Sequence, residues 1–317
     1  MEIISIQDKN ILVTGGAGFI GSHLIERLAK NNNVCIIDNF SRGKKSDIEH
    51  IDCDIVNIDL SNKEIPKDIV DSAEIVFHLA SSVGSYKFYK DNPLEVLKIN
   101  TSIDWNIFKS FESKLVKLFY ASSSHIYPAS LQSNIDAPPL KEEDAFPCDP
   151  SLSYGWNKIS SEKYLQYYNG PMKIAIGRYN GIYGPRQSLD LKRGSIIPVL
   201  IERARRYPQK DYKIISKGLE QRSFCFIHDA IDATVKMTEA LDHRKFVGPY
   251  NIGKQEKISI KDLALLIKNL INPSMEFKVE DQLEASIMCQ WCDCSTIKEE
   301  LGWEAKTSLE EGIKKII

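Results

Sequence analysis

The sequence predicts an α/β fold in which a doubly wound parallel sheet carries helices on both faces. Short apolar runs rich in β-branched residues alternate with segments of helical length from residue 11 onward, and a glycine-rich turn follows the first run directly. Strands this apolar are typical of a parallel sheet that is covered on both faces. In such a sheet, ligands bind in the crevice outside the carboxyl ends of the strands.

Six apolar runs indicate the strands of this sheet, and three segments between them indicate its helices. The predicted strands are Ile11–Thr14, Val34–Asp38, Ile55–Asp59, Ile75–Leu79, Leu118–Ser122 and Ile174–Arg178. The predicted helices are Gly21–Lys30, Pro93–Phe111 and Tyr154–Tyr168. Between the last two helices, Ser130–Pro150 is rich in Pro, Asp and Glu, which favours a surface loop.

After Arg178 the elements become shorter and less regular. We expect helices near Ile197–Tyr207, Asp229–Leu241 and Ile260–Ile271 and a strand near Lys213–Ile215. This change predicts a Rossmann-type domain over residues 1–178, which would hold the cofactor and catalytic groups. A smaller α/β substrate-binding lobe would follow over 179–317, and its chain could cross back to the sheet.

The composition is that of an ordinary globular chain, and it narrows the possible partners. The 317 residues are 43% hydrophobic, which is enough for a substantial core, and the formal net charge is -2. This balance provides no field that would attract nucleic acid or an anionic membrane. The longest apolar runs, such as residues 75–80, are far shorter than the roughly 20 residues of a spanning helix.

Cysteine usage favours a reducing compartment. Seven cysteines, an odd number, indicate free thiols and the cytoplasm, and residues 1–10 show no pattern of a secretory signal. Cys289, Cys292 and Cys294 lie within six residues, but a structural zinc site needs four ligands and no nearby Cys or His completes the set. We expect packing thiols and no metal, with metal or redox use as the alternative.

The glycine-rich turn after the first strand predicts a dinucleotide site. Gly15, Gly18 and Gly21 are three residues apart, and such a turn lets a pyrophosphate rest on backbone N–H groups at a helix N-terminus. Asp38, at the end of the second strand, is placed to accept from the adenosine ribose and to repel a 2′-phosphate, so NAD is predicted rather than NADP. The cofactor residues assigned around this turn are Gly15, Gly18, Phe19, Ile20, Gly21, Asp38, Asn39 and Ser41.

Two further strand ends fit the same crevice. Asp59 and Leu60 close the third strand, where a carboxylate can accept from the adenine amino group, and the alternative is an ordinary turn residue. Leu79, Ala80 and Ser81 end the fourth strand, as needed where a backbone approaches a ligand, although taken alone they indicate only a tight strand end.

A tyrosine and a lysine on one helix face predict the catalytic base. Tyr154 and Lys158 stand at i and i+4, and an ammonium group beside a phenol lowers a pKa that is ordinarily about 10. Such pairs are frequent by chance in helices. Ser123 adds weight because it ends the fifth strand, beside the predicted crevice, where its hydroxyl can share the substrate hydroxyl with Tyr154. The alternative for this serine run is a solvated turn.

Motifs that run in order over nearly the whole chain carry a resemblance to a known family. They are Thr14-Gly-Gly-Ala-Gly-Phe-Ile-Gly21, Asp38, His78-Leu-Ala80, Ser122-Ser123, Tyr154-x-x-x-Lys158, Arg178-x-x-x-x-Tyr183-Gly-Pro185, Arg222-x-Phe-x-x-Ile-x-Asp229 and Leu301-Gly-Trp303. With them the chain resembles the extended short-chain dehydrogenase/reductases of the NAD-dependent epimerase/dehydratase family, which act on nucleotide sugars. Residues 121–128 and 219–227 look most like GDP-mannose 3,5-epimerases, whereas UDP-glucose 4-epimerases and 4,6-dehydratases share the frame less closely.

The resemblance implies an epimerase that works through transient oxidation at sugar C4. By this resemblance, Tyr154 removes the proton of the C4 hydroxyl. Lys158 also binds the nicotinamide ribose, and Ser123 takes the catalytic Ser/Thr position. Ser124-His125 stands where the dehydratases carry Asp-Glu, which disfavours elimination. His125 takes the place of the cysteine acid/base of the 3,5-epimerases. Its imidazole can exchange protons at a carbon beside the ketone, or it may serve only in a hydrogen bond within the turn.

Other functions stay open at this point. A nucleotide-sugar 4-dehydrogenase or a 4,6-dehydratase would begin with the same oxidation, and a non-catalytic NAD-binding sensor or scaffold would use the fold without the chemistry. The intact Ser123, Tyr154 and Lys158 weigh against the sensor. A homodimer through 93–111 and 154–168 is implied by the resemblance alone.

The substrate side departs from the family pattern. The predicted substrate contacts are Ser124, Asn180, Ser195 and Arg222. Gly181 stands where the family places an asparagine, four residues before the proline of Tyr-Gly-Pro. Arg222 matches the arginine that grips substrate phosphate, but a second basic clamp is missing before Asp293, where the chain carries Leu283, Met288 and Gln290. Either Arg186, Lys192, Arg193 or Lys217 replaces the missing second clamp, or the substrate is not a conventional nucleotide diphosphate. Each of these basic residues is more often a solvated surface charge.

Overall fold

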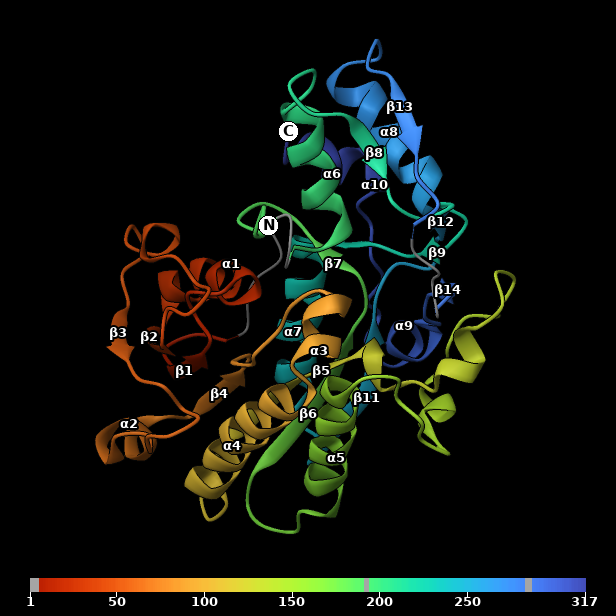
Figure 1. The fold of residues 1–317 in the computed structure, drawn as a ribbon. Coiled ribbons are helices and arrows are strands. Elements are labelled where there is room, and N and C mark those ends of the chain that lie inside the picture. The colour runs from red at the N-terminus through yellow and green to blue at the C-terminus, as the bar shows by residue number, and fades with distance from the viewer. Residues whose placement is uncertain (1–5, 191–193, 283–286) are drawn as a thin grey trace.

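A seven-stranded parallel sheet lies at the centre of the molecule in a computed structural model that describes residues 6–190, 194–282 and 287–317 (Figure 1). In sheet order its strands are β3 (Asp54–Asn57), β2 (Asn33–Asp38), β1 (Asn10–Thr14), β4 (Ile75–His78), β5 (Lys117–Ser123), β6 (Lys173–Tyr179) and β11 (Phe246–Ile252). The six predicted strands are confirmed, with ends that differ by one or two residues. Because the strand order reverses between β1 and β4, the ligand crevice opens at their carboxyl ends.

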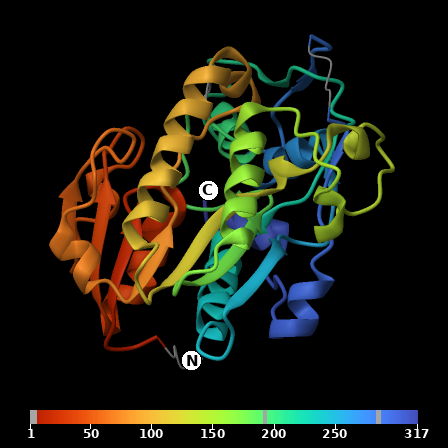
Figure 2. The ribbon, with the colours of Figure 1, turned by 90° about the horizontal axis from the view of Figure 1, so that it is seen from below.

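Helices cover both faces of the sheet, which confirms the doubly wound α/β class. Leu12 and Val13 are neighbours in β1, yet they belong to different hydrophobic cores, because successive strand residues point to opposite faces. On one face pack α1 (Phe19–Leu28) and α7 (Ile227–Ala240), and on the other α2 (Lys67–Ser72), α4 (Pro93–Phe111) and α5 (Ser153–Tyr167). Figure 2 shows α4 and α5 side by side across the sheet.

The C-terminal half builds a smaller lobe above the carboxyl ends of the strands (Figure 1). Its main elements are α6 (Ile196–Arg205), α8 (Ile260–Ile271), α10 (Leu309–Lys314), β8 (Tyr212–Ile214) and β13 (Phe277–Val279). Two-residue strands join it to the crevice: β7 (Ile182–Tyr183) pairs with β10 (Cys225–Phe226), and β9 (Gln221–Arg222) lies between β12 (Ile258–Ser259) and β14 (Cys289–Gln290). The predicted helices and strand of this half are confirmed within three residues.

The remaining elements are short. They are α3 (Tyr86–Asp91), α9 (Ser295–Leu301) and the 3₁₀ helices η1 (Ala29–Asn31), η2 (Lys45–Asp47), η3 (Ser124–Ile126), η4 (Ala129–Gln132) and η5 (Glu142–Ala145). Among the described residues, every helix is too short or too polar to span a bilayer.

The chain crosses back to the sheet through α7 and β11, so the second half also completes the first. Strand β11 pairs in parallel with β6, and the register shifts between Val247 and Tyr250. The sequence did not predict this strand because Gly248-Pro249 is a turn signal, and proline is tolerated in a sheet mainly at edges and bulges. The division at residue 178 stays a prediction.

The segment Ser130–Pro150 is only partly the surface loop that its composition predicts. Leu140 and Ala145 are buried, and Leu140 forms a bridge with Cys292. The carbonyl of Leu140 accepts from the backbone N–H of Asp293 at 2.9 Å. The prediction was wrong for these residues. The acidic composition of a segment indicates its average exposure, but it does not identify the few apolar residues that pack into the core.

The three clustered cysteines lie in the interior. Cys289, Cys292 and Cys294 are free and buried, and burial raises the pKa of Cys294 to about 12. Within 6–190, 194–282 and 287–317, no group of three or more His, Cys, Asp or Glu side chains is arranged to hold a metal ion. The burial of these thiols fits small apolar packing groups.

Candidate active site

The glycine turn is held tightly between the end of β4 and the start of α1. Gly15 has φ +73°, and a Cβ atom there would lie 2.8 Å from the backbone nitrogen of Ala80. A Cβ atom on Gly21 would lie 2.2 Å from the carbonyl oxygen of Gly15. Gly18 is the N-cap of α1 and supplies no side-chain cap, and Phe19 and Ile20 form the half-buried first turn. The turn therefore excludes side chains while leaving N–H groups of the first turn available to an anion.

Asp38 fastens this turn to the loop after β2. Its Oδ2 accepts from the N–H of Ala17 at 3.0 Å, and its Oδ1 accepts from the N–H of Phe40 at 2.8 Å. Burial raises the pKa of Asp38, and these two backbone hydrogen bonds oppose that rise. Each carboxylate oxygen retains a lone pair for a further donor, so the predicted contact with a ribose fits this geometry.

The other predicted adenine-side residues gather at neighbouring strand ends. The exposed Asn39 hydrogen-bonds Asp59, and the exposed Ser41 donates its N–H to Asn39 Oδ1 at 3.0 Å. Asp59 also accepts from the N–H and hydroxyl of Ser61 at 2.9 and 2.7 Å, so it serves the turn as well. Leu60 is buried beneath it.

At the end of β4 a buried hydroxyl has no partner. Leu79 and Ala80 donate their N–H groups to the carbonyl and the hydroxyl of Thr14, at 3.1 and 3.3 Å, and so lie against the glycine turn. The Oγ of Ser81, next along the chain, is buried and makes no hydrogen bond among the described residues. A buried polar atom without a partner is costly, and a ligand in the crevice would relieve that cost.

The predicted catalytic groups converge at the start of α5. The side chain of Ser123, at the end of β5, hydrogen-bonds Tyr154 and lies 3.1 Å from Nδ1 of His125. The His125 ring meets the Tyr154 ring edge to face, with 5.7 Å between centroids. Lys158, one turn along α5, places its Nζ 5.9 Å from the centre of the Tyr154 ring. The structure thus brings Ser123, His125, Tyr154 and Lys158 together.

Burial dominates the acid-base behaviour of this group. Tyr154 is 8% exposed, and burial raises the pKa of its phenol well above the usual range, while the hydrogen bond from Ser123 lowers it. Burial, followed by the positive charge of Arg222, lowers the pKa of His125 to about 4. His125 is therefore neutral near pH 7, when it can accept a proton but does not supply one readily.

On the substrate side, Arg222 is half-buried and oriented by backbone carbonyls. Its Nη1 donates to the carbonyl of Gln221 at 2.8 Å, and its Nη2 donates to the carbonyl of Ile287 at 2.9 Å. Its positive charge contributes to the lowered pKa of His125, which places the guanidinium near the predicted catalytic residues. In the parallel strand β14, Gln290 stands opposite Arg222 in register, so this position supplies an amide and not a second cation.

The other three predicted substrate residues differ in their accessibility. Asn180 is buried and donates its side-chain N–H to the hydroxyl of Ser223, the residue after Arg222, at 2.7 Å. Ser124 is buried within η3. Ser195 is exposed at the start of α6, where its hydroxyl accepts from Gln187 at 3.1 Å.

The departure at Gly181 has a steric cause. Gly181 has φ +60°, and a Cβ atom there would lie 2.0 Å from the carbonyl oxygen of Ser223. A residue with a side chain does not fit here because two backbones cross at this position. This crossing explains why the asparagine of the family pattern is absent.

Of the proposed compensating cations, the two that the structure describes, Arg186 and Lys217, are each paired with an acid. Arg186 pairs with Glu26 at 2.7 Å and donates to the carbonyl of Ser22, so it is committed to α1. Lys217 lies 3.5 Å from Asp281, and both side chains are exposed. Leu283, Lys192 and Arg193 lie outside the described residues.

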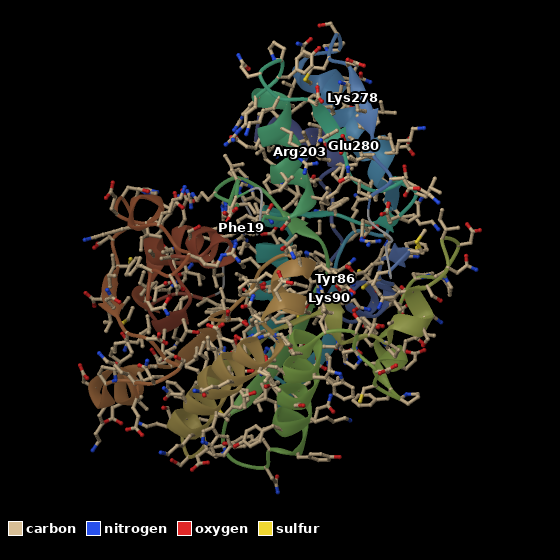
Figure 3. The ribbon with its side chains drawn as sticks, viewed as in Figure 1. Phe19, Tyr86, Lys90, Arg203, Lys278 and Glu280 are labelled. Atoms are coloured by element: carbon tan, nitrogen blue, oxygen red, sulfur yellow. The ribbon has the colours of Figure 1, made fainter. Side chains whose placement is uncertain are left out.

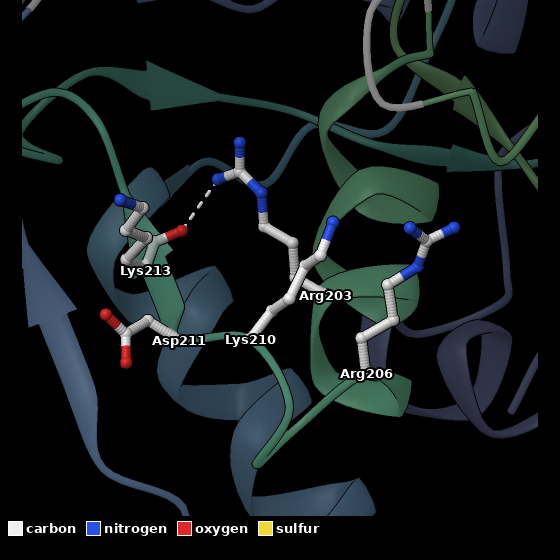
Figure 4. Close-up of a pocket in the computed structure, with 5 residues that line it drawn as sticks. All are labelled: Arg203, Arg206, Lys210, Asp211 and Lys213. Atoms are coloured by element: carbon white, nitrogen blue, oxygen red, sulfur yellow. Dashed lines mark hydrogen bonds between the residues drawn. The ribbon is translucent and has the colours of Figure 1, made fainter.

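A basic cavity of about 300 Å³ lies on the C-terminal lobe, at the far end of α6 (Figure 4). Arg203 Nη1 donates to the carbonyl of Lys213 at 2.6 Å across it. Figure 3 shows that Arg203 lies in the upper lobe, well above Phe19 and Tyr86 at the crevice. Two of its cations are already paired with acids, Arg206 with Glu202 and Lys213 with Glu280.

Sequence reasoning missed two residues of the site, Tyr89 and Asp104. Tyr89 is 4% exposed, and its ring stacks on Tyr154 with centroids 4.9 Å apart and planes 14° apart. Asp104 is 2% exposed on the apolar stripe of α4, between Ile103 and Ile107. A carboxylate in such a stripe was a visible signal, because unpaired acids are rarely buried. Tyr89 gave no comparable signal.

The family described as "NAD dependent epimerase/dehydratase family" matches residues 11–253. The GDP-mannose 3,5-epimerase of Arabidopsis thaliana is 28% identical over 312 residues, which cover 97% of this chain and 81% of that protein. The UDP-glucuronic acid decarboxylase 3 of the same plant is 29% identical over 318 residues, which cover 96% of this chain and 87% of that protein.

Solved structures agree with these relatives. The UDP-N-acetylglucosamine 4-epimerase of Methanobrevibacter ruminantium, in complex with UDP-N-acetylmuramic acid, superposes with a TM-score of 0.85 at 26% identity, covering 98% of each chain. The UDP-glucuronic acid 4-epimerase of Bacillus cereus, in complex with UDP-glucuronic acid and NAD, superposes with a TM-score of 0.82 at 26% identity, covering 96% of this chain and 97% of that one.

Proposed function

The chain belongs to the NAD dependent epimerase/dehydratase family, and from this premise we propose that it is an NAD-dependent nucleotide-sugar epimerase that oxidises sugar C4 transiently. One observation carries the proposal: Ser123, Tyr154 and Lys158 converge beside a glycine turn that excludes side chains. Relatives and neighbours with related names act on nucleotide sugars by epimerisation or decarboxylation. A non-catalytic sensor would have no use for this convergence.

The residues at the sheet edge fit NAD. The cradle of Gly15 and Gly21 has room for backbone contact with a pyrophosphate and none for a side chain. Asp38 retains acceptor capacity for a ribose, and the partnerless hydroxyl of Ser81 lies at the adjoining strand end. When bound, NAD supplies the chemistry of hydride acceptance from a sugar carbon and its later return.

Tyr154 would remove the proton of the C4 hydroxyl. Burial raises the pKa of its phenol, so the positive charge of Lys158 is needed to stabilise the phenolate. Ser123 would donate to the same substrate oxygen and hold it against Tyr154. The ketone so formed makes the neighbouring C–H bonds acidic, and the neutral His125 is the group placed to accept a proton there.

Arg222 would orient the substrate from the other side of the crevice. Its two anchoring hydrogen bonds to backbone carbonyls fix the guanidinium plane, which suits recognition of one phosphate group. We assign residues 1–178 mainly to the cofactor and 179–317 mainly to the substrate, with β11 and α7 serving the sheet.

A second function is favoured by the decarboxylase relative. In a uronic acid, a ketone at C4 stands β to the C6 carboxylate, and such acids lose carbon dioxide readily. The same first step by Tyr154 would therefore lead to decarboxylation if the substrate carries a C6 carboxylate and no base intercepts the ketone.

A panel of nucleotide sugars in deuterated water tests the proposal, with NMR of the product, absorbance of NADH and release of carbon dioxide as readouts. Deuterium at C3 or C5 without net NADH identifies 3,5-epimerisation, and inversion at C4 without exchange identifies a 4-epimerase. Either result supports the proposal. Net NADH identifies a dehydrogenase, carbon dioxide a decarboxylase and loss of C6 hydroxyl a dehydratase, and each of these, like a complete lack of turnover, would overturn it.

We also propose a cytoplasmic homodimer. The seven free cysteines suit a reducing compartment. On α4 and α5, Leu94, Trp105 and Trp156 are 80, 53 and 42% exposed, an apolar surface that a second copy would cover. The molar mass in solution, measured for the wild type and for Trp105→Glu, checks the dimer: a monomeric wild type contradicts it.

A further inference from the structure

Asp104 is a carboxylate in the interior of the protein that binds four donors at once. Its Oδ1 accepts from His78 Nε2 at 3.0 Å. Its Oδ2 accepts from the hydroxyl of Tyr120 at 2.8 Å, the amide of Asn157 at 3.1 Å and the hydroxyl of Ser161 at 2.6 Å. These donors come from β4, β5 and α5, so one acid on α4 joins the sheet to the catalytic helix.

Hydrogen bonds from neutral donors do not balance the negative charge of Asp104. Burial lowers the pKa of His78, so this partner is a neutral imidazole, and its Nδ1 lies 2.7 Å from the hydroxyl of Thr14. A charge buried without a cation is costly, which makes the nearest cationic side chain important.

That cation is Lys158. Its Nζ lies 4.6 Å above the centre of the Tyr120 ring, the same ring whose hydroxyl donates to Asp104. Lys158 is 2% exposed. It is the largest favourable influence that lowers the pKa of Asp104, which falls to about 2 in spite of burial.

The second acid near Lys158 is already occupied. Glu162 accepts from Arg178 Nη2 at 2.8 Å and Nε at 3.1 Å, and Ser122 donates to the same carboxylate. This pairing leaves Asp104 as the carboxylate whose charge is directed to Lys158.

We propose that Asp104 is a positioning residue, whose buried carboxylate keeps Lys158 protonated beside Tyr154 and holds the catalytic helix against the sheet. The inference deepens the proposed function, on which its meaning for the reaction rests. Without Asp104, burial would favour the neutral amine of Lys158, and a neutral amine cannot stabilise the phenolate of Tyr154.

The groups that face Lys158 set the direction of the effect. They are Asp104 from α4, Glu162 and Tyr154 from α5, Tyr120 from β5 and His78 from β4. Removing the charge of Asp104 removes the largest influence that opposes burial, so the pKa of Lys158 must fall. Removing one neutral donor to Asp104 leaves that charge in place.

The test is an NMR titration of Lys158 in protein labelled with ¹³C at lysine Cε, assigned by the signal lost in Lys158→Met. We expect Asp104→Asn to lower the pKa of Lys158 by about one unit or more. Ser161→Ala, which removes a donor without changing charge, should leave it within a few tenths. Equal pKa values in the wild type and Asp104→Asn would overturn the inference. Because no substrate is used, that result would leave the proposed function standing.

A reciprocal measurement serves if Asp104→Asn does not fold. In protein labelled with ¹³C at aspartate Cγ, Lys158→Met should raise the pKa of Asp104 by about one unit or more from its low value. An unchanged pKa would show that Asp104 is only a hydrogen-bond acceptor. Once a substrate is known, kcat can be followed as the pH is raised. For Asp104→Asn it should begin to fall at a lower pH than for the wild type, while KM stays unchanged.

Discussion

The two sides of the crevice are built in different ways. On the predicted cofactor side, Gly15, Asp38 and Ser123 each end or follow a strand of one sheet, and the buried carboxylate of Asp104 accepts hydrogen bonds from neighbouring elements. On the substrate side, Arg222 belongs to a two-residue strand between β12 and β14, segments distant in the chain, and is oriented by backbone carbonyls. The difference teaches that the proposed catalytic residues are positioned by the sheet, whereas the proposed substrate residue Arg222 is positioned by short strand pairings.

The largest expected effect comes from removing the base on the cofactor side. Tyr154→Phe should lower kcat by about 1,000-fold or more, because the ring still stacks on Tyr89 while the proton acceptor is lost. NAD affinity, measured by calorimetry, should stay within about threefold. Tyr164→Phe, on the same helix and stacked on Phe108, is the matched control and should keep full turnover. Normal turnover in Tyr154→Phe would exclude this base.

His125 lies between the two sides and should separate the steps. His125→Ala should reduce carbon–deuterium exchange by about 100-fold or more while sparing C4 oxidation. Since the pKa of His125 is about 4, the imidazole is already deprotonated at pH 6, so exchange should show no inflection of this group between pH 6 and 8 and should decline as pH falls toward 4. Isotope incorporation followed against pH measures this. Normal exchange in the variant would remove His125 from the mechanism, whereas an inflection near pH 6.5 that is lost in His125→Ala would contradict the lowered pKa of this residue.

A smaller effect is expected on the substrate side. Arg222→Lys should raise KM for a nucleotide sugar by about tenfold and change kcat little, because a lysine cannot keep both carbonyl contacts and bind a phosphate with a fixed plane. Arg206→Lys, a surface residue paired with Glu202, is the control. Initial rates over a range of substrate concentrations decide the matter. If kcat falls as much as kcat/KM, the division of labour between the two sides does not hold.

The sequence predicted where the proposed cofactor residues lie in the fold because their motifs are tied to strand ends. Gly15, Asp38 and Ser123 each follow or end a strand whose apolar run is visible, so topology alone places them in one crevice. Tyr89 and Asp104 could not be placed in this way, because their roles arise from contacts between helices far apart in the sequence.

The substrate side was less predictable for physical reasons. Two-residue strands such as β9 have no periodicity to detect, and the cause of the departure at Gly181 becomes visible only where its backbone meets that of Ser223. Strand β11 was hidden by Gly248-Pro249, although its Asn251 hydrogen-bonds the Tyr127 hydroxyl at 2.6 Å beneath the site.

The late position of β11 in the chain has a consequence for biosynthesis. Until residue 252 has left the ribosome, β6 presents a bare edge with unpaired backbone groups, because its neighbour on that side has not yet been made. A nascent chain therefore cannot complete the seven-stranded sheet before residue 252 has been translated. A gene fragment that ends at residue 178 would lack β11, and the exposed edge of β6 would favour aggregation of the polypeptide.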